Sequence, residues 1–207
     1  MQNWNLIFGI SIISSPILFA MIAFPDSVAW SWNEGRGGYF FALIFIVAEL
    51  IGLKIVISKK KLLVVLPLAL ATIAYLVSLE YGLREYIIES AEFFDVQLIY
   101  SWTWMWDFVV MAIFIVAALS IFFGKRWIRI APAGPIFLIG TAIILSLDAF
   151  FPYDTLGPLQ YVVPYFVQAN VWIITTLDLG TAVARDNVMF LRGDHGSMAL
   201  QVFWPSA

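Results

Sequence analysis

The feature that most constrains this chain is a series of apolar runs, each about as long as a lipid bilayer is thick. Five runs hold few charged residues, at positions 6–24, 39–58, 62–79, 96–123 and 130–151. A helix needs about 20 apolar residues to cross a hydrocarbon core of about 30 Å. A sixth run, 159–183, is more polar, so it either crosses the membrane fully, or lies on the outer face or re-enters.

The composition agrees with a membrane location. Of the 207 residues, 62% are hydrophobic and 12% are charged, whereas soluble domains carry about 25% charged residues. A water-exposed surface needs more charge than this, so lipid must cover much of the chain. We therefore predict an all-α integral membrane protein, a bundle of about six hydrophobic helices in the cell membrane with the lipid bilayer as a partner.

Several functional classes are disfavoured by the same counts. The net charge of −3 indicates no nucleic-acid partner. The absence of cysteine excludes disulfides, thiolate metal sites and a cysteine nucleophile. One histidine cannot build a histidine-rich metal site. We expect no metal and no cofactor.

The charges between the runs predict an orientation. Residues 80–95 carry six charged side chains, five of them acidic, at helical spacing and predict an amphipathic helix lying in the interface. Glu80 precedes Arg84 by four residues, the favourable order for an ion pair. Basic loops face the cytoplasm, which places the amino terminus inside and the acidic segment outside. The basic loop residues are Lys59, Lys60, Lys61, Lys125, Arg126 and Arg129.

The last part of the chain has the pattern of a β-hairpin. Two apolar stretches, 188–191 and 199–204, flank the turn-rich sequence Arg192-Gly193-Asp194-His195-Gly196. We therefore divide the chain into a membrane bundle, 1–183, and a hairpin-like extracytoplasmic tail, 184–207.

Ionisable residues inside apolar runs are costly in lipid and are candidates for function. Asp107 follows an aromatic belt and Asp148 lies near the end of its run. Such positions favour a structural role over a functional one for both residues. Glu49 is central, and Lys54 or a polar group on another helix could pair with it. Asp178 lies in the polar sixth run. Those four residues are the intramembrane polar candidates.

His195 is the one side chain whose ordinary pKa lies near neutral pH, so it could act as a general base, although flanking glycines suit a solvated turn. Ser206 could be a nucleophile only with an adjacent base and an oxyanion hole.

Short motifs from Leu159 onward carry a family resemblance. Leu159-Gln160 is followed by Leu179-Gly180, then by Val183-Ala184-Arg185, and finally by Val202-Phe203-Trp204-Pro205-Ser206-Ala207. In order and spacing this stretch resembles the membrane-embedded exosortases and archaeosortases, and most closely their thaumarchaeal branch. In that family a hairpin leads into the motif that holds a cysteine nucleophile. Ser206 takes the position of that cysteine.

The resemblance implies an archaeal transpeptidase or protease, a hydrolase that processes the carboxy-terminal sorting signals of exported proteins. It implies Ser206 as the nucleophile, with His195 as a candidate base and Arg185 and Arg192 as candidate substrate-binding residues. It also favours an extracytoplasmic tail. The family's further arginine and histidine lie downstream of the nucleophile motif, so the sequence is either a fragment or a shortened homologue.

Two other functions stay open. The chain could be a non-catalytic subunit that joins other membrane subunits in a larger complex, which its aromatic helices and the 80–95 segment would suit. It could also be a transporter that uses Glu49 and the membrane aspartates, although no internal repeat supports this reading.

Overall fold

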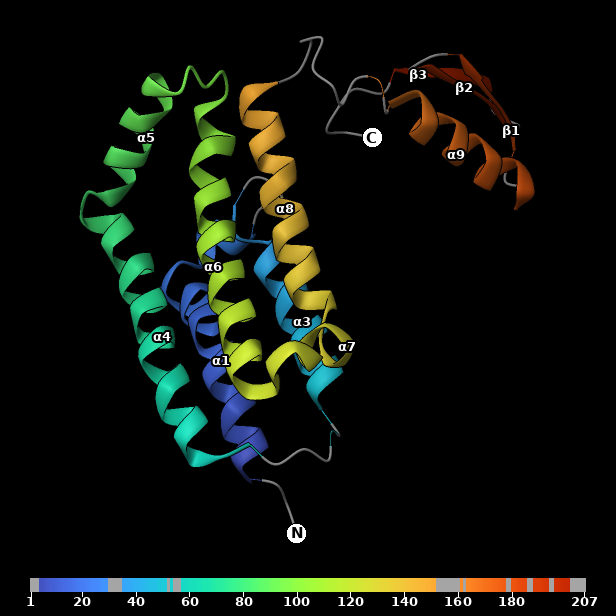
Figure 1. The fold of residues 1–207 in the computed structure, drawn as a ribbon. Helices are drawn as coiled ribbons and strands as arrows, with labels where there is room; N and C mark the ends of the chain where they lie inside the picture. The colour runs from blue at the N-terminus through green and yellow to red at the C-terminus, as the bar shows by residue number, and fades with distance from the viewer. Residues whose placement is uncertain are drawn as a thin grey trace. The chain divides into compact units, whose positions relative to one another are not determined.

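The computed structural model of the chain describes residues 4–29, 35–51, 53, 57–151, 161, 163–177, 180–185, 188–193 and 196–201. Helices dominate these residues (Figure 1). The helices are α1 (Trp4–Ala23), α2 (Pro25–Ala29), α3 (Gly38–Leu50), α4 (Lys59–Ser78), η1 (Leu79–Tyr81), α5 (Leu83–Phe93), α6 (Ile99–Phe123), η2 (Gly124–Arg126), α7 (Trp127–Ile130), α8 (Ala133–Phe150) and α9 (Val163–Thr176), and the strands are β1 (Thr181–Arg185), β2 (Val188–Gly193) and β3 (Gly196–Gln201).

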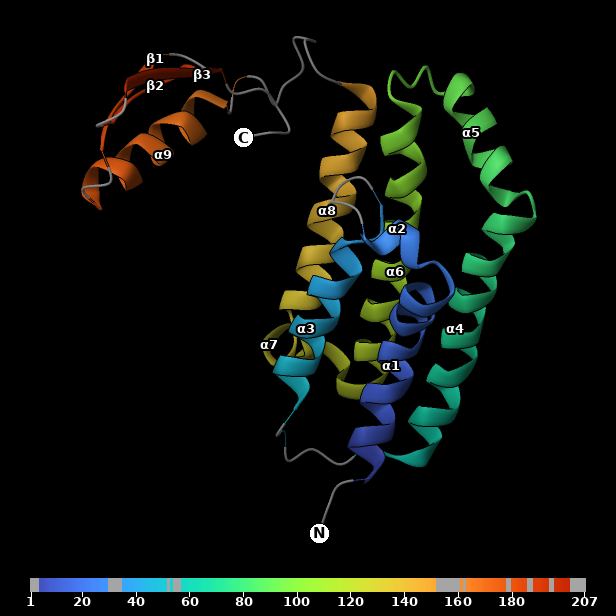
Figure 2. The same cartoon turned by 180° about the vertical axis from the view of Figure 1, so that it is seen from behind.

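The chain divides into two compact units, residues 1–146 and residues 147–207. The first unit is a helix bundle. In it α1 packs against α4 and α3, α4 packs against α6, and α5 packs against the start of α6. Figure 2 shows α1 in front of α6. The sequence boundary that we expected lies after residue 183, whereas the contacts group α9 with the strands that follow it.

The prediction of a helical bundle is confirmed, and four of its helices have the length and composition of membrane spans. The segments Trp4–Ala23, Lys59–Tyr81, Ile99–Ile130 and Ala133–Phe150 are long and apolar enough to cross a bilayer. Their apolar side chains point both inward and outward, since Ile13 and Ile115 are fully buried while Ile22 is 80% exposed. A helix that is hydrophobic on all sides is typical of a lipid-facing bundle.

The second and sixth runs form shorter helices than a full crossing requires. Helix α3 has 13 residues, and α9 has 14; at 1.5 Å per residue each is about 20 Å long, short of a core of about 30 Å. Helix α3 ends where Ile51 adopts an extended backbone. Val183, which we had placed in the sixth run, belongs to β1.

The acidic segment is a helix with a break near its start. Gly82 has a φ of 105°, in the left-handed region, and separates η1 from α5. The expected ion pair between Glu80 and Arg84 is wrong, because this break removes the helical i,i+4 geometry. Trp102 on α6 donates from its indole nitrogen to the Ile87 carbonyl and to Ser90, which holds α5 against α6.

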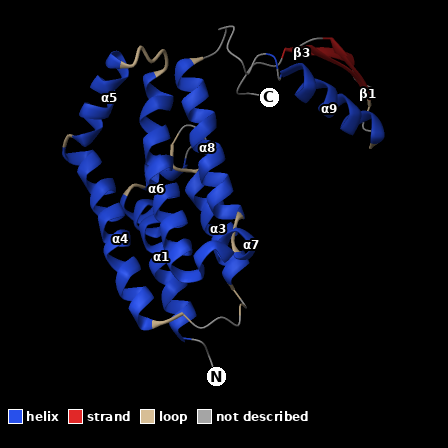
Figure 3. Ribbon diagram, viewed as in Figure 1, coloured by secondary structure: helices blue, strands red, loops and turns tan. Residues whose placement is uncertain are grey.

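The second unit contains α9 and a three-stranded antiparallel sheet in the order β1-β2-β3. All three strands described in the chain lie there (Figure 3). The expected hairpin is confirmed as β2 and β3, paired from Val188 with Gln201 to Gly193 with Gly196. Strand β1 adds a third strand that the apolar pattern did not predict, and α9 packs against β1 and β2. Exposure alternates along β1, so one face of the sheet is covered and the other is open.

Candidate functional site

Gly35 and Arg36, which precede α3, lie against Ser27 of α2. Ser27 on α2 donates its hydroxyl to the Phe24 carbonyl, over 2.8 Å. The Arg36 backbone N–H donates to the Ser27 carbonyl over 2.6 Å. Gly35 is needed for this approach, because a Cβ there would meet the Ser27 carbonyl oxygen. The turn carries the Arg36 side chain into the bundle.

Arg36 forms a buried ion pair with Asp107 of α6. Its Nε lies 2.8 Å from the Asp107 Oδ2, and the two side chains are 1% and 0% exposed. The Arg36 Nη1 also donates to the Ser27 hydroxyl, over 3.1 Å. Removing both charges from water is costly, so such a pair persists only when its remaining groups are well bonded. Arg36 therefore ties the start of α3 to the first part of α6.

Two tyrosines complete the bonding of Asp107. The Tyr75 hydroxyl on α4 donates to the Asp107 Oδ1 over 3.1 Å. The Tyr39 hydroxyl on α3 donates to the Asp107 backbone carbonyl over 2.8 Å, and its ring meets Phe108 edge to face. Three helices thus converge on one aspartate, and both of its carboxylate oxygens are occupied.

An aromatic frame surrounds the guanidinium group. The Arg36 Cζ lies 5.0 Å from the Phe24 ring centre and 5.3 Å from the Trp104 ring centre. A second arginine, Arg84 of α5, lies over the same Trp104 ring at 4.9 Å. Cations over an indole face are stabilised by its quadrupole. We call Arg36, Arg84, Trp104 and Asp107, with Tyr39 and Tyr75, the charged centre.

The sequence singled out one member of the charged centre. Asp107 was a candidate because it is an acid in an apolar run, and the structure gives it a structural ion pair. Arg36, Tyr75 and Arg84 were missed. Arg36 lies outside every apolar run and 71 residues from its partner. The one sequence feature that could have marked it as a site residue is its position between two glycines in an aromatic-rich segment.

Glu49 serves as a cap for another helix. Both of its carboxylate oxygens accept from the Ala133 backbone N–H, at 3.0 and 3.2 Å. Ala133 is the first residue of α8, where backbone N–H groups lack helical partners and negative charge is favourable. One of the two partners expected for Glu49, a polar group on another helix, is observed. The other, Lys54, falls outside the described residues. Gly134 lets α3 approach, because a Cβ there would meet Ile46.

The other sequence candidates belong to the second compact unit or fall outside the described residues. Asp148 is buried on α8, with 6% of its surface exposed. Arg185 and Arg192 are exposed on β1 and β2 of the second unit. Asp178, His195 and Ser206 fall outside the described residues. Among the residues that are described, no group of three acidic, histidine or cysteine side chains could hold a metal ion.

The fold and the charged centre define a class, a helical bundle in which four helices are long and apolar enough to cross a membrane and one ion pair is buried inside. Comparisons of the chain with known protein families, with curated proteins and with solved structures found no match.

Proposed function

We propose that this protein lies in the cell membrane with its basic end in the cytoplasm. Lys61 donates from Nζ to the Phe122 carbonyl over 2.7 Å, so the lysines that open α4 lie beside the end of α6. Lys125 and Arg126 follow directly in η2. The acidic α5 packs against the opposite end of α6. Grouping of the positive loops at one end of the bundle is what the positive-inside rule requires.

On this orientation, the protein acts at the outer face as a sorting transpeptidase or protease of the archaeosortase type. The observation that supports this is the hairpin formed by β2 and β3, which ends at Gln201 immediately before the motif that holds Ser206. The resemblance requires a hairpin in that place. Its substrates would be exported proteins with carboxy-terminal sorting signals.

The register of the sheet distinguishes the two candidate arginines. Arg185 pairs with Val188, and Val188 pairs with Gln201, so Arg185 lies at the end of the sheet from which the Ser206 motif continues. Arg192 pairs with Thr181 and Ser197 near the opposite end of the sheet. Because Gln201 directly precedes the Ser206 motif in the sequence, Arg185 is our first candidate for binding a substrate.

The test is processing of an exported reporter with a carboxy-terminal sorting signal, in cells that produce the natural full-length protein. We expect Ser206→Ala to reduce processing to background, because an alanine offers no nucleophile. Ser206→Cys should retain it, since a thiolate forms more readily than an alkoxide. Ser197→Ala, on an exposed position of β3, is the matched control.

A second pair of variants checks the arginine assignment in the same assay. Arg185→Gln should lower processing more than Arg192→Gln, although both remove one exposed positive charge from the same sheet. Full processing by Ser206→Ala would eliminate the enzymatic proposal for this chain.

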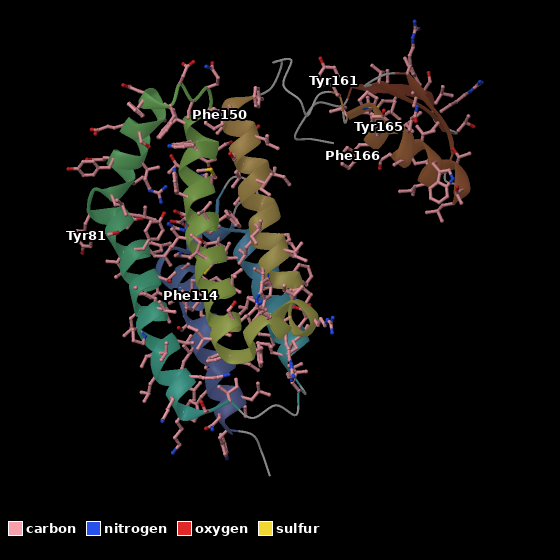
Figure 4. All side chains as sticks on the ribbon, viewed as in Figure 1. Tyr81, Phe114, Phe150, Tyr161, Tyr165 and Phe166 are labelled. Carbon is pink, nitrogen blue, oxygen red and sulfur yellow. The ribbon has the colours of Figure 1, made fainter. Side chains whose placement is uncertain are left out.

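A non-catalytic membrane subunit is the alternative, and the surface beside α5 favours it. Tyr81, Tyr86 and Phe93 are 85%, 73% and 84% exposed, and Tyr81 points away from the bundle (Figure 4). Exposed aromatic side chains are frequent anchors of protein interfaces. Isolation of the protein from its native membrane as a lone monomer in mild detergent would argue against this alternative.

A further inference from the structure

The charged centre carries more positive than negative charge. Two guanidinium groups, those of Arg36 and Arg84, lie over one Trp104 ring. Asp107 balances Arg36, and it is the partner in the one ion pair found among the described residues. Arg84 forms no ion pair within that part of the chain. An excess charge between helices of a membrane protein needs a counter-charge.

One hydrogen-bond donor of this centre is buried and unused. Arg36 donates from Nε to Asp107 and from Nη1 to Ser27, and these two bonds fix the plane of its guanidinium group. Its Nη2 has no hydrogen-bond partner among the described residues, in a side chain that is 1% exposed. A fixed guanidinium with a free N–H is preorganised to bind an oxyanion.

Arg84 is the member of the charged cluster of two arginines, Trp104 and Asp107 that is partly exposed. Arg84 lies two residues after the break at Gly82 and is half-buried, so it can reach both the Trp104 ring and the surroundings of the bundle. The long, flexible side chain of an arginine at a membrane boundary suits this position, because its stem packs on apolar surface while its charge stays accessible.

The level of the centre in the bundle indicates the kind of anion. Trp104 lies between Trp102 and Trp106 near the start of α6, and the rings of those two tryptophans meet edge to face. Tryptophan concentrates at the headgroup level of a bilayer. The abundant anion at that level is the phosphate of the lipids, and a guanidinium matches the geometry of phosphate oxygens.

We propose that Arg36 and Arg84, framed by Trp104, form a binding site for a phosphate group. The Arg36 Nη2 donates to one phosphate oxygen, and Arg84 neutralises the charge from the accessible side. A lipid phosphodiester and free inorganic phosphate share this chemistry. The site is independent of Ser206 and of the sorting proposal, so binding is measured without any processing step.

The experiment measures binding of dioctanoyl phosphatidylglycerol, dioctanoylglycerol and inorganic phosphate to the full-length protein in a neutral detergent, by isothermal titration calorimetry. We expect the phosphatidylglycerol to bind and Arg84→Gln to weaken it about ten-fold or more, the effect of losing one charge-assisted hydrogen bond. Arg84→Lys should weaken it less. Arg129→Gln removes a positive charge from α7 at the opposite end of the bundle and should leave affinity unchanged.

Each outcome decides the proposal. Binding of inorganic phosphate with the same sensitivity to Arg84→Gln identifies free phosphate as a ligand, and binding of the lipid alone identifies a headgroup site. Equal binding of dioctanoylglycerol would mean that the acyl chains are recognised and would overturn the proposal. Failure of every probe, or equal weakening by Arg84→Gln and Arg129→Gln, would overturn it too. Arg84→Lys keeps the test valid if Arg84→Gln misfolds.

Discussion

Single residues matter most where a charge has been taken out of water. Replacing Asp107 with Asn leaves Arg36 buried beside a neutral amide, and loss of one partner from a buried ion pair typically costs about 3–5 kcal/mol. We therefore expect Asp107→Asn to lower the thermal unfolding midpoint in detergent strongly. Glu85→Gln, at an exposed position of α5, removes the same charge and should change the midpoint little.

A double variant separates the ion pair from its surroundings. Arg36→Gln combined with Asp107→Asn removes both charges, so it should lose less stability than the two single variants added together. Additive losses would show that the two side chains act independently and that the pair is not the reason for their burial.

The sequence revealed those residues of the site that break a local pattern. Asp107 and Glu49 were recognisable, because an acid in an apolar run is rare whatever the fold. Their partners were not, since Arg36 and the Ala133 N–H come from segments 71 and 84 residues away. The spacing predicts an ion pair between Arg84 and Glu80. In the structure the left-handed Gly82 separates these two residues, and Arg84 packs over the Trp104 ring.

At the scale of the helices, Gly82 sets where α5 begins. Its φ of 105° suits glycine, and a Cβ there would meet nothing within 4 Å. Gly82→Ala should therefore destabilise the protein by about 1–2 kcal/mol through backbone strain alone. Gly140 is the matched control, because its added Cβ also meets nothing but its backbone is helical in α8. Gly140→Ala should stabilise by about 0.5–1 kcal/mol.

Thermal unfolding of both variants checks this pair. Equal effects of the two substitutions, or a stabilising Gly82→Ala, would show that the left-handed turn is not maintained. The affinity of the Gly82→Ala variant for phosphatidylglycerol is a second measurement. It should fall if the turn at Gly82 positions Arg84 over Trp104.

The elements that the sequence predicted well are those whose pattern is long. The runs at 6–24, 62–79, 96–123 and 130–151 correspond to α1, α4, α6 and α8, and the turn residues near His195 located the β2–β3 hairpin. The prediction failed for short elements. An apolar stretch of a few residues fits a helix end or a strand equally well, and Thr181–Arg185 became β1 by pairing with β2, which no local pattern encodes.

At the scale of the whole molecule, charge distribution predicts which end of the bundle faces the cytoplasm. The chain has no cysteine, so single cysteines can be introduced without removing any. Lys60 opens α4 at the basic end, and Glu89 lies on α5 beside the opposite end of α6; both are exposed. Because basic segments stay inside, a membrane-impermeant maleimide added to intact cells should label Glu89→Cys and leave Lys60→Cys unlabelled.

Permeabilised cells provide the control, since both variants should then react equally. Labelling of Lys60→Cys in intact cells would invert the orientation and place the charged centre, with its phosphate site, in the cytoplasmic half of the bundle. Protection of both cysteines in intact cells would contradict the placement of α5 at the outer face. Either result would remove the topological support for an enzyme acting on exported proteins, because that proposal rests on the orientation with the basic end in the cytoplasm.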